Sequence, residues 1–251
     1  MCNFKRREFI KLNALGFAAI ALQLSTVSSY AQQANGYLGK LGTNTKLNWD
    51  AFLEKITQLS QSQHQLPWDQ KMYTQKVKQL LLQCNFPEFE NVKREMDNYE
   101  NKNLKWFEAS SLHHEVDFQI SLFQFEKGEY IPHHDHPDMT GVINVVSGSA
   151  HLRNYNRIEE LGSRTVTTNG QKIIKQSCIL KEVSNQIAKT GDVSILTSND
   201  GNIHSVMPNE FTQLVDVFTP AYTENTNPKW YKVDEEEFYK QQEKLFVAEY
   251  Y

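Results

Sequence analysis

Short runs of alternating apolar and polar residues fill the chain from about position 104 onward, and this period of two restricts the fold more than any other feature. Successive side chains of a β-strand point to opposite faces, so such alternation predicts strands. The runs lie at 118–122, 142–146, 151–155, 164–168, 173–180, 193–196 and 213–218. Asn169-Gly170 separates two of them and is a strong hairpin signal. Repeated strands of this spacing predict a closed or sandwiched all-β body over residues 104–232.

Two helical segments precede this body, within a region that we place at residues 47–103. Their apolar residues recur at the three- and four-residue spacing of a buried helix face. These residues are Trp49, Phe52, Ile56 and Leu59 in the first segment, and Met72, Val77, Leu80 and Leu81 in the second. A third, weaker helical piece is predicted over 89–99. The region is expected to pack on the β-body.

The last segment, 233–251, is predicted to be an amphipathic helix. Asp234 is a suitable N-cap, and the three glutamates that follow it would lie in the first turn, where they complement the helix dipole. Phe238, Leu245 and Phe246 would form the buried stripe. The predicted fold is therefore mainly β, a small barrel with N-terminal helices and a C-terminal helix.

Residues 1–31 resemble a twin-arginine export signal. The run Lys5-Arg6-Arg7-Glu8-Phe9-Ile10-Lys11 precedes an apolar stretch, and Ser29-Tyr30-Ala31 offers the small residues that a signal peptidase needs. The stretch is too short to span a bilayer, so we expect no membrane segment in the mature form. The resemblance implies export by the twin-arginine machinery after folding, to the periplasm or the outside. A linker is predicted over 32–46.

Charge and cysteine content narrow the possible partners. The formal net charge is -4 and the basic residues are dispersed, which argues against a nucleic-acid surface. Cys84 and Cys178 remain after cleavage; they could pair in an oxidising compartment or stay as buried free thiols. We expect a monomer.

Three histidines fall within 131–140, and their spacing predicts a metal site. His134 and His136 are alternate residues and would project to one side of a strand, whereas His133 would point away. His204 arrives from a distant strand as a third nitrogen ligand. A histidine cluster of this kind can also be a solvated turn.

Glycines around the histidines strengthen the metal interpretation. Gly128 and Gly148 flank the first block, and Gly191 and Gly201 precede His204 in a second block. Together the blocks resemble the paired motifs of the cupin superfamily, a small jelly-roll β-barrel with a metal in its mouth.

The general cupin pattern often places a glutamate ligand at the position of Gly141. Its absence predicts a neutral three-histidine set, which favours an anionic ligand such as a thiolate and leaves room for O2.

A closer resemblance is carried by three motifs in order. They are Ile131-Pro132-His133-His134-Asp135-His136-Pro137-Asp138-Met139, then Asn202-Ile203-His204, then Asp216-Val217-Phe218-Thr219-Pro220-Ala221-Tyr222. These motifs are similar to those of the cysteamine dioxygenase and plant cysteine oxidase family, over roughly 118–231.

This resemblance implies Fe(II) held by His134, His136 and His204, and a thiol oxidised by O2 to a sulfinic acid. The substrate would be a small aminothiol or an N-terminal cysteine. Asp216 would hold the substrate ammonium, and Tyr222 would donate a hydrogen bond near the bound oxygen. Asp216 could instead be a structural acceptor and Tyr222 a rim aromatic.

The chain departs from the family pattern at three places. Asp138 stands where the family usually has glycine, and Ala221 replaces the second proline of the last motif. Pro228 and Trp230 occupy the places of the family's Cys-x-Tyr, so a cysteine-tyrosine crosslink is excluded there.

Two other functions fit the same residues. One is a non-catalytic cupin that binds a metal or a small ligand, since Asp138 and Ala221 could mark a drifted pocket. The other is a cupin oxygenase or isomerase acting on a carbon substrate.

Overall fold

The computed structural model describes residues 46–89, 108–168 and 171–250. The helical elements are α2 (Trp49–Ser60), the 3-10 helix η1 (Gln61–His64), α3 (Gln70–Gln83) and the 3-10 helix η2 (Gln241–Glu243). The first strands are β1 (Glu108–His114), β2 (Gln119–Phe125), β3 (Ile131–His134), β4 (Thr140–Ser147), β5 (Ser149–Thr168) and β6 (Gln171–Lys189). The others are β7 (Val193–Leu196), β8 (Ile203–Pro208), β9 (Thr212–Thr219), β10 (Tyr231–Lys240) and β11 (Leu245–Tyr250).

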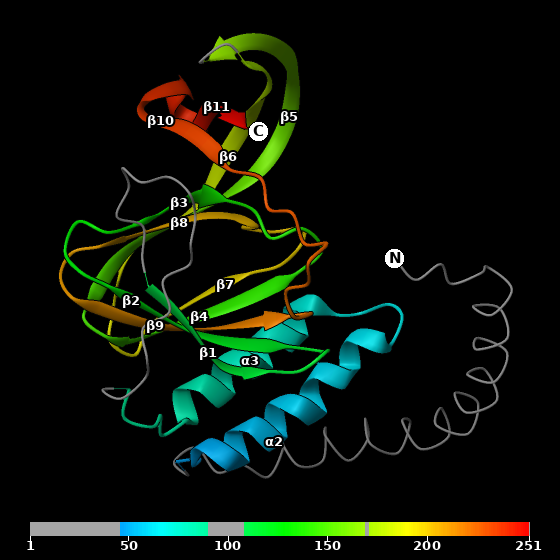
Figure 1. The fold of residues 1–251 in the computed structure, drawn as a ribbon, viewed down its shortest axis with the longest axis vertical. Helices are drawn as coiled ribbons and strands as arrows, with labels where there is room; N and C mark the ends of the chain where they lie inside the picture. Colours follow the sequence, from blue (N-terminus) through cyan, green and yellow to red (C-terminus); the bar gives the residue numbers. More distant parts are fainter. Residues whose placement is uncertain (1–45, 90–107, 169–170, 251) are drawn as a thin grey trace, which may run out of the picture. The chain divides into compact units, whose positions relative to one another are not determined.

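The strands form two antiparallel sheets whose facing sides enclose the core (Figure 1). One sheet has the order β1-β2-β9-β4-β7, and the other has the order β10-β11-β6-β5-β8-β3. Both sheets contribute buried side chains to one apolar cluster. Its members are Phe125, Ile131, Ile143, Val145, Ala150, Leu152, Ala188, Val206 and Leu214. The mainly β barrel predicted from the alternating runs is therefore confirmed.

Helices α2 and α3 lie against the five-stranded sheet, where α3 contacts β4 and β7 (Figure 1). Each helix begins at a side-chain cap: Asn48 accepts from the backbone N–H of Ala51, and Asp69 accepts from that of Met72. Most residues of the predicted apolar stripes are buried, but Met72 is 49% exposed and its neighbour Tyr73 is buried instead. A buried hydrogen bond of 2.6 Å joins Tyr73 of α3 to Thr219 at the end of β9.

Gly148 shows why one glycine of the cupin pattern is needed for the turn between β4 and β5. Its φ is +78°, in the left-handed region that glycine adopts at little cost. A Cβ at this position would lie 2.2 Å from the backbone oxygen of Phe211, which no side chain could tolerate. The glycine allows the loop between β8 and β9 to pass directly against this turn.

The prediction of a C-terminal helix is wrong. The segment forms β10 and β11, joined by the short η2, and β11 pairs with β6 along Leu245–Tyr250. Phe246, Ala248 and Tyr250 are buried in alternation, which is a strand period. β5 and β6 are long, and the exposed edge of β6 offers β11 a row of backbone partners. Pairing and burial therefore override the helical preference of the glutamate-rich sequence.

Several sequence predictions lie outside the described residues: the export signal and most of the linker at 1–45, residues 90–99 of the third helix, and Asn169-Gly170. Thr168 pairs with Gln171 on either side of that dipeptide.

None of the described helices is long and apolar enough to cross a membrane.

Candidate metal centre and its cavity

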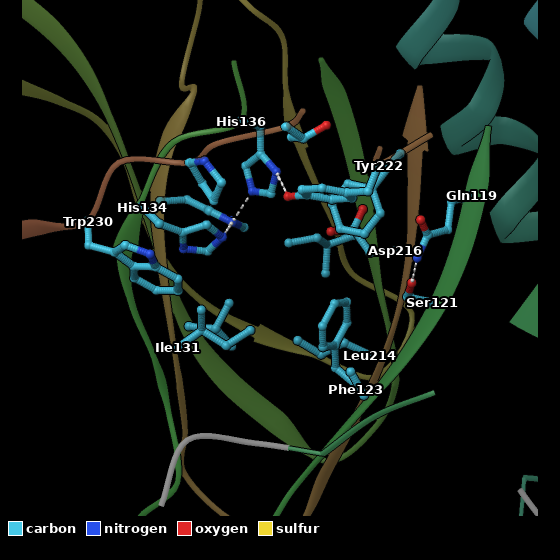
Figure 2. A pocket seen from close by; sticks show the side chains of 17 residues that line it. Gln119, Ser121, Phe123, Ile131, His134, His136, Leu214, Asp216, Tyr222 and Trp230 are labelled. Atoms are coloured by element: carbon cyan, nitrogen blue, oxygen red, sulfur yellow. Dashed lines mark hydrogen bonds between the residues drawn. The ribbon is translucent and has the colours of Figure 1, made fainter. Parts of the chain in front are cut away.

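Three histidines meet inside the barrel, beside the β3–β8 pair. His134 of β3 and His204 of β8 are register partners, and His136 follows two residues after His134. The Nε2 atoms of His136 and His204 are 2.9 Å apart, and those of His204 and His134 are 3.3 Å apart (Figure 2). All three side chains are buried. The structure therefore contains the three-histidine metal site that the sequence predicts.

Hydrogen bonds at the far ring nitrogens hold two of the imidazoles in a ligating orientation. The Nδ1–H of His134 donates to the carbonyl of Pro132 over 2.9 Å. Nδ1 of His136 lies 2.5 Å from the phenol oxygen of Tyr222. Donation from Nδ1 in each ring leaves the Nε2 lone pair directed at the centre of the cluster, as a metal ligand requires.

Burial also keeps these rings neutral. It lowers the pKa of His134 to about 4, and it lowers the pKa values of His136 and His204 well below the usual range. Desolvation is the main cause in each case, and neighbouring histidines lower the pKa further: His133 acts on His134, and His134 acts on both His136 and His204. Neutral imidazole is the form that binds a metal ion.

The donor geometry suits a first-row divalent metal ion with open positions. Two metal–nitrogen bonds of about 2.1 Å at a right angle would separate their nitrogens by about 3.0 Å. The separations of 2.9 Å and 3.3 Å are close to this value. Three neutral donors on one face would leave the ion its full charge and an open face for other ligands.

No carboxylate joins the histidines within the described residues. A Cβ at Gly141 would lie 3.1–3.3 Å from three side-chain carbons of Leu196. The space that a side chain at position 141 would enter is thus filled by a buried leucine. A larger side chain at position 141 would therefore require Leu196 to move.

Asn202 fixes the main chain that carries His136. Its Oδ1 accepts from the backbone N–H of His136 over 2.9 Å, and its Nδ2 donates to the carbonyl of the same residue over 2.8 Å. Nδ2 also donates to the carbonyl of Thr197. One amide therefore holds the ligand loop to the loop before β8. The role of Asn202 was not predicted from the sequence, although its position two residues before the ligand His204 could have indicated it.

Asp135 joins the ligand loop to the segment before β10. Its Oδ1 accepts from the backbone N–H of Lys229 over 2.7 Å, and its Oδ2 accepts from the hydroxyl of Tyr231 over 2.9 Å. Between these two residues, Trp230 reaches the site and lines the cavity. Asp135, the middle residue of His-Asp-His, is thus a structural anchor.

The histidines open into a cavity of about 350 Å³. Its lining is mostly apolar, with Phe123, Ile131, Leu214 and Trp230 among the residues labelled in Figure 2. The polar side chains opposite the histidines belong to β2 and β9. Two of them, Gln119 and Ser121, were not predicted, because polar residues on a strand were expected to face solvent.

Asp216 of β9 lies in the cavity wall and is 2% exposed. Burial raises the pKa of its carboxyl to about 8, although hydrogen bonds from the backbone at Val142 and Val217 oppose the rise. Its Oδ1 has no hydrogen-bond partner among the described residues. A buried oxygen without a donor is costly, so it favours a donor brought by a ligand.

Tyr222 follows β9 and lines the same cavity. Besides bonding to His136, its ring packs edge-on against Phe218, with centroids 4.9 Å apart. The structure therefore brings Asp216 and Tyr222 into one cavity with the three histidines.

The remaining histidines and cysteines lie elsewhere. His133 packs edge-on against Tyr155, outside the three-histidine group. His64 bonds Asp117, and His113 bonds Glu115. Cys84 and Cys178 are both buried, and no disulfide joins them.

The departures from the family pattern have local explanations. Asp138 has φ +59°, a left-handed conformation that suits glycine and that aspartate tolerates better than most residues. Its side chain is exposed, and neither Asp138 nor Ala221 lines the cavity. Pro228 and Trp230 both line it.

The sequence of residues 68–248 matches the model of the PCO_ADO family. No curated protein matches the chain.

Several solved structures resemble it at low identity. One is a conserved protein with a double-stranded β-helix domain from Klebsiella pneumoniae, at 18% identity and TM-score 0.34, covering 57% of this chain and 94% of that one. Another is an RmlC-like cupin from Desulfovibrio desulfuricans, at 16% identity and TM-score 0.31, covering 52% and 99%. A third is a cupin superfamily protein from Desulfitobacterium hafniense, at 16% identity and TM-score 0.30, covering 55% and 96%.

Proposed function

The chain belongs to the PCO_ADO family of cupins, which includes cysteamine dioxygenases and plant cysteine oxidases, and on this basis we propose that it is an iron-dependent thiol dioxygenase. The substrate would be a small aminothiol or a peptide with an N-terminal cysteine. The observation that carries the proposal is the pairing of a neutral three-histidine site with a buried, partly unsatisfied carboxyl in one cavity.

The reaction balances without another reductant. A thiol and O2 give a sulfinic acid: two sulfur–oxygen bonds form, the sulfur loses four electrons, and the two oxygen atoms gain them. Iron held by His134, His136 and His204 would bring the thiolate and O2 together and supply the redox chemistry. The protein's part is to hold both reactants in a mostly apolar cavity beside the three histidines.

Asp216 supports an amine-bearing substrate. An ammonium group would give Oδ1 the hydrogen-bond donor that it lacks among the described residues. A cation beside the carboxyl favours its ionised form, so binding would lower the raised pKa and release a proton. The acid would thus act as the anchor for the substrate nitrogen.

Tyr222 supports the same site through His136. When Nδ1–H of His136 donates to the phenol oxygen, the phenol proton remains available to donate to a ligand in the cavity. Tyr222 would therefore orient one metal ligand and offer one hydrogen bond to a reactant.

The cavity charge argues against substrates that carry a free carboxylate. Among the described residues that line it there is no Lys or Arg, whereas Asp216 adds a potential negative charge. A carboxylate placed there would be desolvated without a counterion. Cysteamine-like thiols and Cys-initiated peptides avoid this cost, but free cysteine does not.

An oxygen-uptake assay tests the function. Iron-loaded protein should consume O2 with cysteamine or a Cys-initiated peptide, and metal-free protein should not. Free cysteine should react more slowly than either. Absence of thiol-dependent uptake by the iron-loaded protein would refute the proposal.

We further propose that the protein is exported after folding and acts outside the cytoplasm. The support is the run Lys5-Arg6-Arg7-Glu8-Phe9-Ile10-Lys11 and the small residues at Ser29-Tyr30-Ala31. Replacing Arg6 and Arg7 by lysine should leave uncleaved precursor in the cytoplasm. An unchanged location would contradict the proposed route, and a mature N-terminus at Gln32 would support the cleavage site.

A further inference from the structure

We infer that Gln119 and Ser121 of β2 form a subsite for the peptide amide that follows the substrate's amino-terminal residue. These two residues would make the enzyme prefer a Cys-initiated peptide over a simple aminothiol, a preference that rests on the proposed function.

The two side chains form a hydrogen-bonded polar pair in a mostly apolar cavity wall. Nε2 of Gln119 donates to Oγ of Ser121 over 3.0 Å, and both residues line the cavity. Ser121 is 4% exposed, so its hydroxyl is almost fully removed from bulk solvent. Figure 2 shows the pair on the far side of Asp216 from the histidines.

The pair presents one donor and one acceptor to the cavity. A hydroxyl can accept and donate at once, so Ser121 keeps its proton to donate after accepting from Gln119. The Gln119 amide keeps its carbonyl oxygen as an acceptor. A peptide amide offers the complement, because its carbonyl accepts and its N–H donates.

The position along β2 matches the order of groups in a Cys-initiated peptide. Ser121 and Asp216 are register partners across β2 and β9, and both side chains line the cavity. Side chains in such a pair lie about 5 Å apart at Cβ. An ammonium on Asp216 would therefore place the neighbouring carbonyl of the same residue toward Ser121, while the thiol extends toward the histidines.

The size of the cavity is consistent with a substrate larger than cysteamine. Its volume of about 350 Å³ exceeds what an aminothiol of four heavy atoms needs. Cysteamine would also leave the Gln119–Ser121 pair without a ligand. The other side chains beside this pair are mostly apolar, so they do not select for a charged side chain on the second residue of the peptide.

The test compares two substrates across variants of the full chain loaded with iron. Ser121→Ala and Gln119→Leu should each lower the ratio of kcat/KM for a Cys-Gly amide to that for cysteamine by about tenfold, mainly through KM. One or two lost hydrogen bonds correspond to that factor. The double variant Ser147→Ala with Gln213→Leu is a matched control, because this Ser–Gln pair on β4 and β9 is also hydrogen-bonded, at 3.0 Å, but does not line the cavity.

Binding to the metal-free protein gives a second readout that does not depend on turnover. The oxygen isosteres Ser-Gly amide and ethanolamine are compared by calorimetric or NMR titration. The wild type should bind the dipeptide amide more tightly, and Ser121→Ala should remove most of that preference.

An unchanged substrate ratio and an unchanged binding preference in both variants would overturn the subsite. If wild-type protein oxidises no thiol, the proposed function fails instead, and the isostere titration still decides the role of the pair.

Discussion

The indole of Trp230 stacks on the imidazole of His134, with ring centroids 4.9 Å apart and planes inclined by 28°. The two residues also form an isolated antiparallel bridge. Trp230 directly precedes β10, and His134 ends β3, the strands at opposite ends of the six-stranded order. The contact therefore joins the two ends of this sheet at the metal centre, and the C-terminal hairpin orients a metal ligand.

Trp230→Leu should weaken metal binding, because it removes the ring that limits rotation of His134. Loss of an outer contact to a ligand typically costs about 10-fold in metal affinity. Competition with a chromogenic chelator measures the dissociation constant. Trp230→Phe, which keeps a stacking ring, should lose less, and equal affinities for wild type and Trp230→Leu would show that the stack does not orient the ligand.

Asn202→Ala should weaken metal binding and lower stability together. It removes both hydrogen bonds to the backbone of His136 and leaves buried groups without partners, at a cost of about 1–3 kcal/mol in the free energy of unfolding. Urea unfolding and a metal titration check the two effects. The control is Asn199→Ala in the same loop, where the side chain is exposed; a similar loss in both variants would contradict the proposed clamp.

Asp138→Gly should stabilise the protein by about 0.5–1 kcal/mol, since glycine adopts the left-handed conformation at this turn without the strain of a Cβ. Asp138→Ala should be destabilising, because alanine keeps the Cβ and tolerates the left-handed conformation less well than aspartate does. Chemical unfolding of the three proteins measures the differences. A destabilised glycine variant would mean that the charge of Asp138 matters more than its backbone conformation.

The stability of the metal-free protein should depend on pH through Asp216. Its carboxyl has a pKa of 3.8 when exposed and about 8 when buried in the fold. Between these values the native state holds a proton that the unfolded state releases, so the free energy of unfolding falls as pH rises through this window. Asp216→Asn lacks this titration, and its stability relative to wild type should increase from about pH 5 to about pH 8. A constant difference across the window would contradict the raised pKa.

The sequence predicts much of the fold and the centre of the site because both depend on local periodicity and spacing. His134 and His136 share a face through simple alternation, and His204 is brought opposite His134 by strand pairing. The two helices were found from their apolar stripes and begin at side-chain caps. The C-terminal hairpin could not be found in this way, since the partner that makes it a strand is the distant β6.

The cavity wall shows a second limit of sequence periodicity. Ile120 and Leu122 are fully buried, as their alternation predicts, but Gln119 and Ser121 line the cavity between them. The helices cover the outer side of this sheet (Figure 1), so both faces of β2 are shielded and polarity no longer marks the solvent side. Asp216 and Tyr222 were predicted only through the family resemblance, because an acid on a buried strand and a tyrosine after it carry no periodic signal of their own.

Mass analysis of the product formed under 18O2 distinguishes thiol dioxygenation from every other reaction considered for this site. Iron-loaded protein is incubated with a Cys-initiated peptide, and the modified residue is located by fragmentation. We predict a sulfinic acid on the N-terminal cysteine, with the 18O label on both of its oxygen atoms. A product with no added oxygen, such as a disulfide, or with label on carbon, would contradict this prediction.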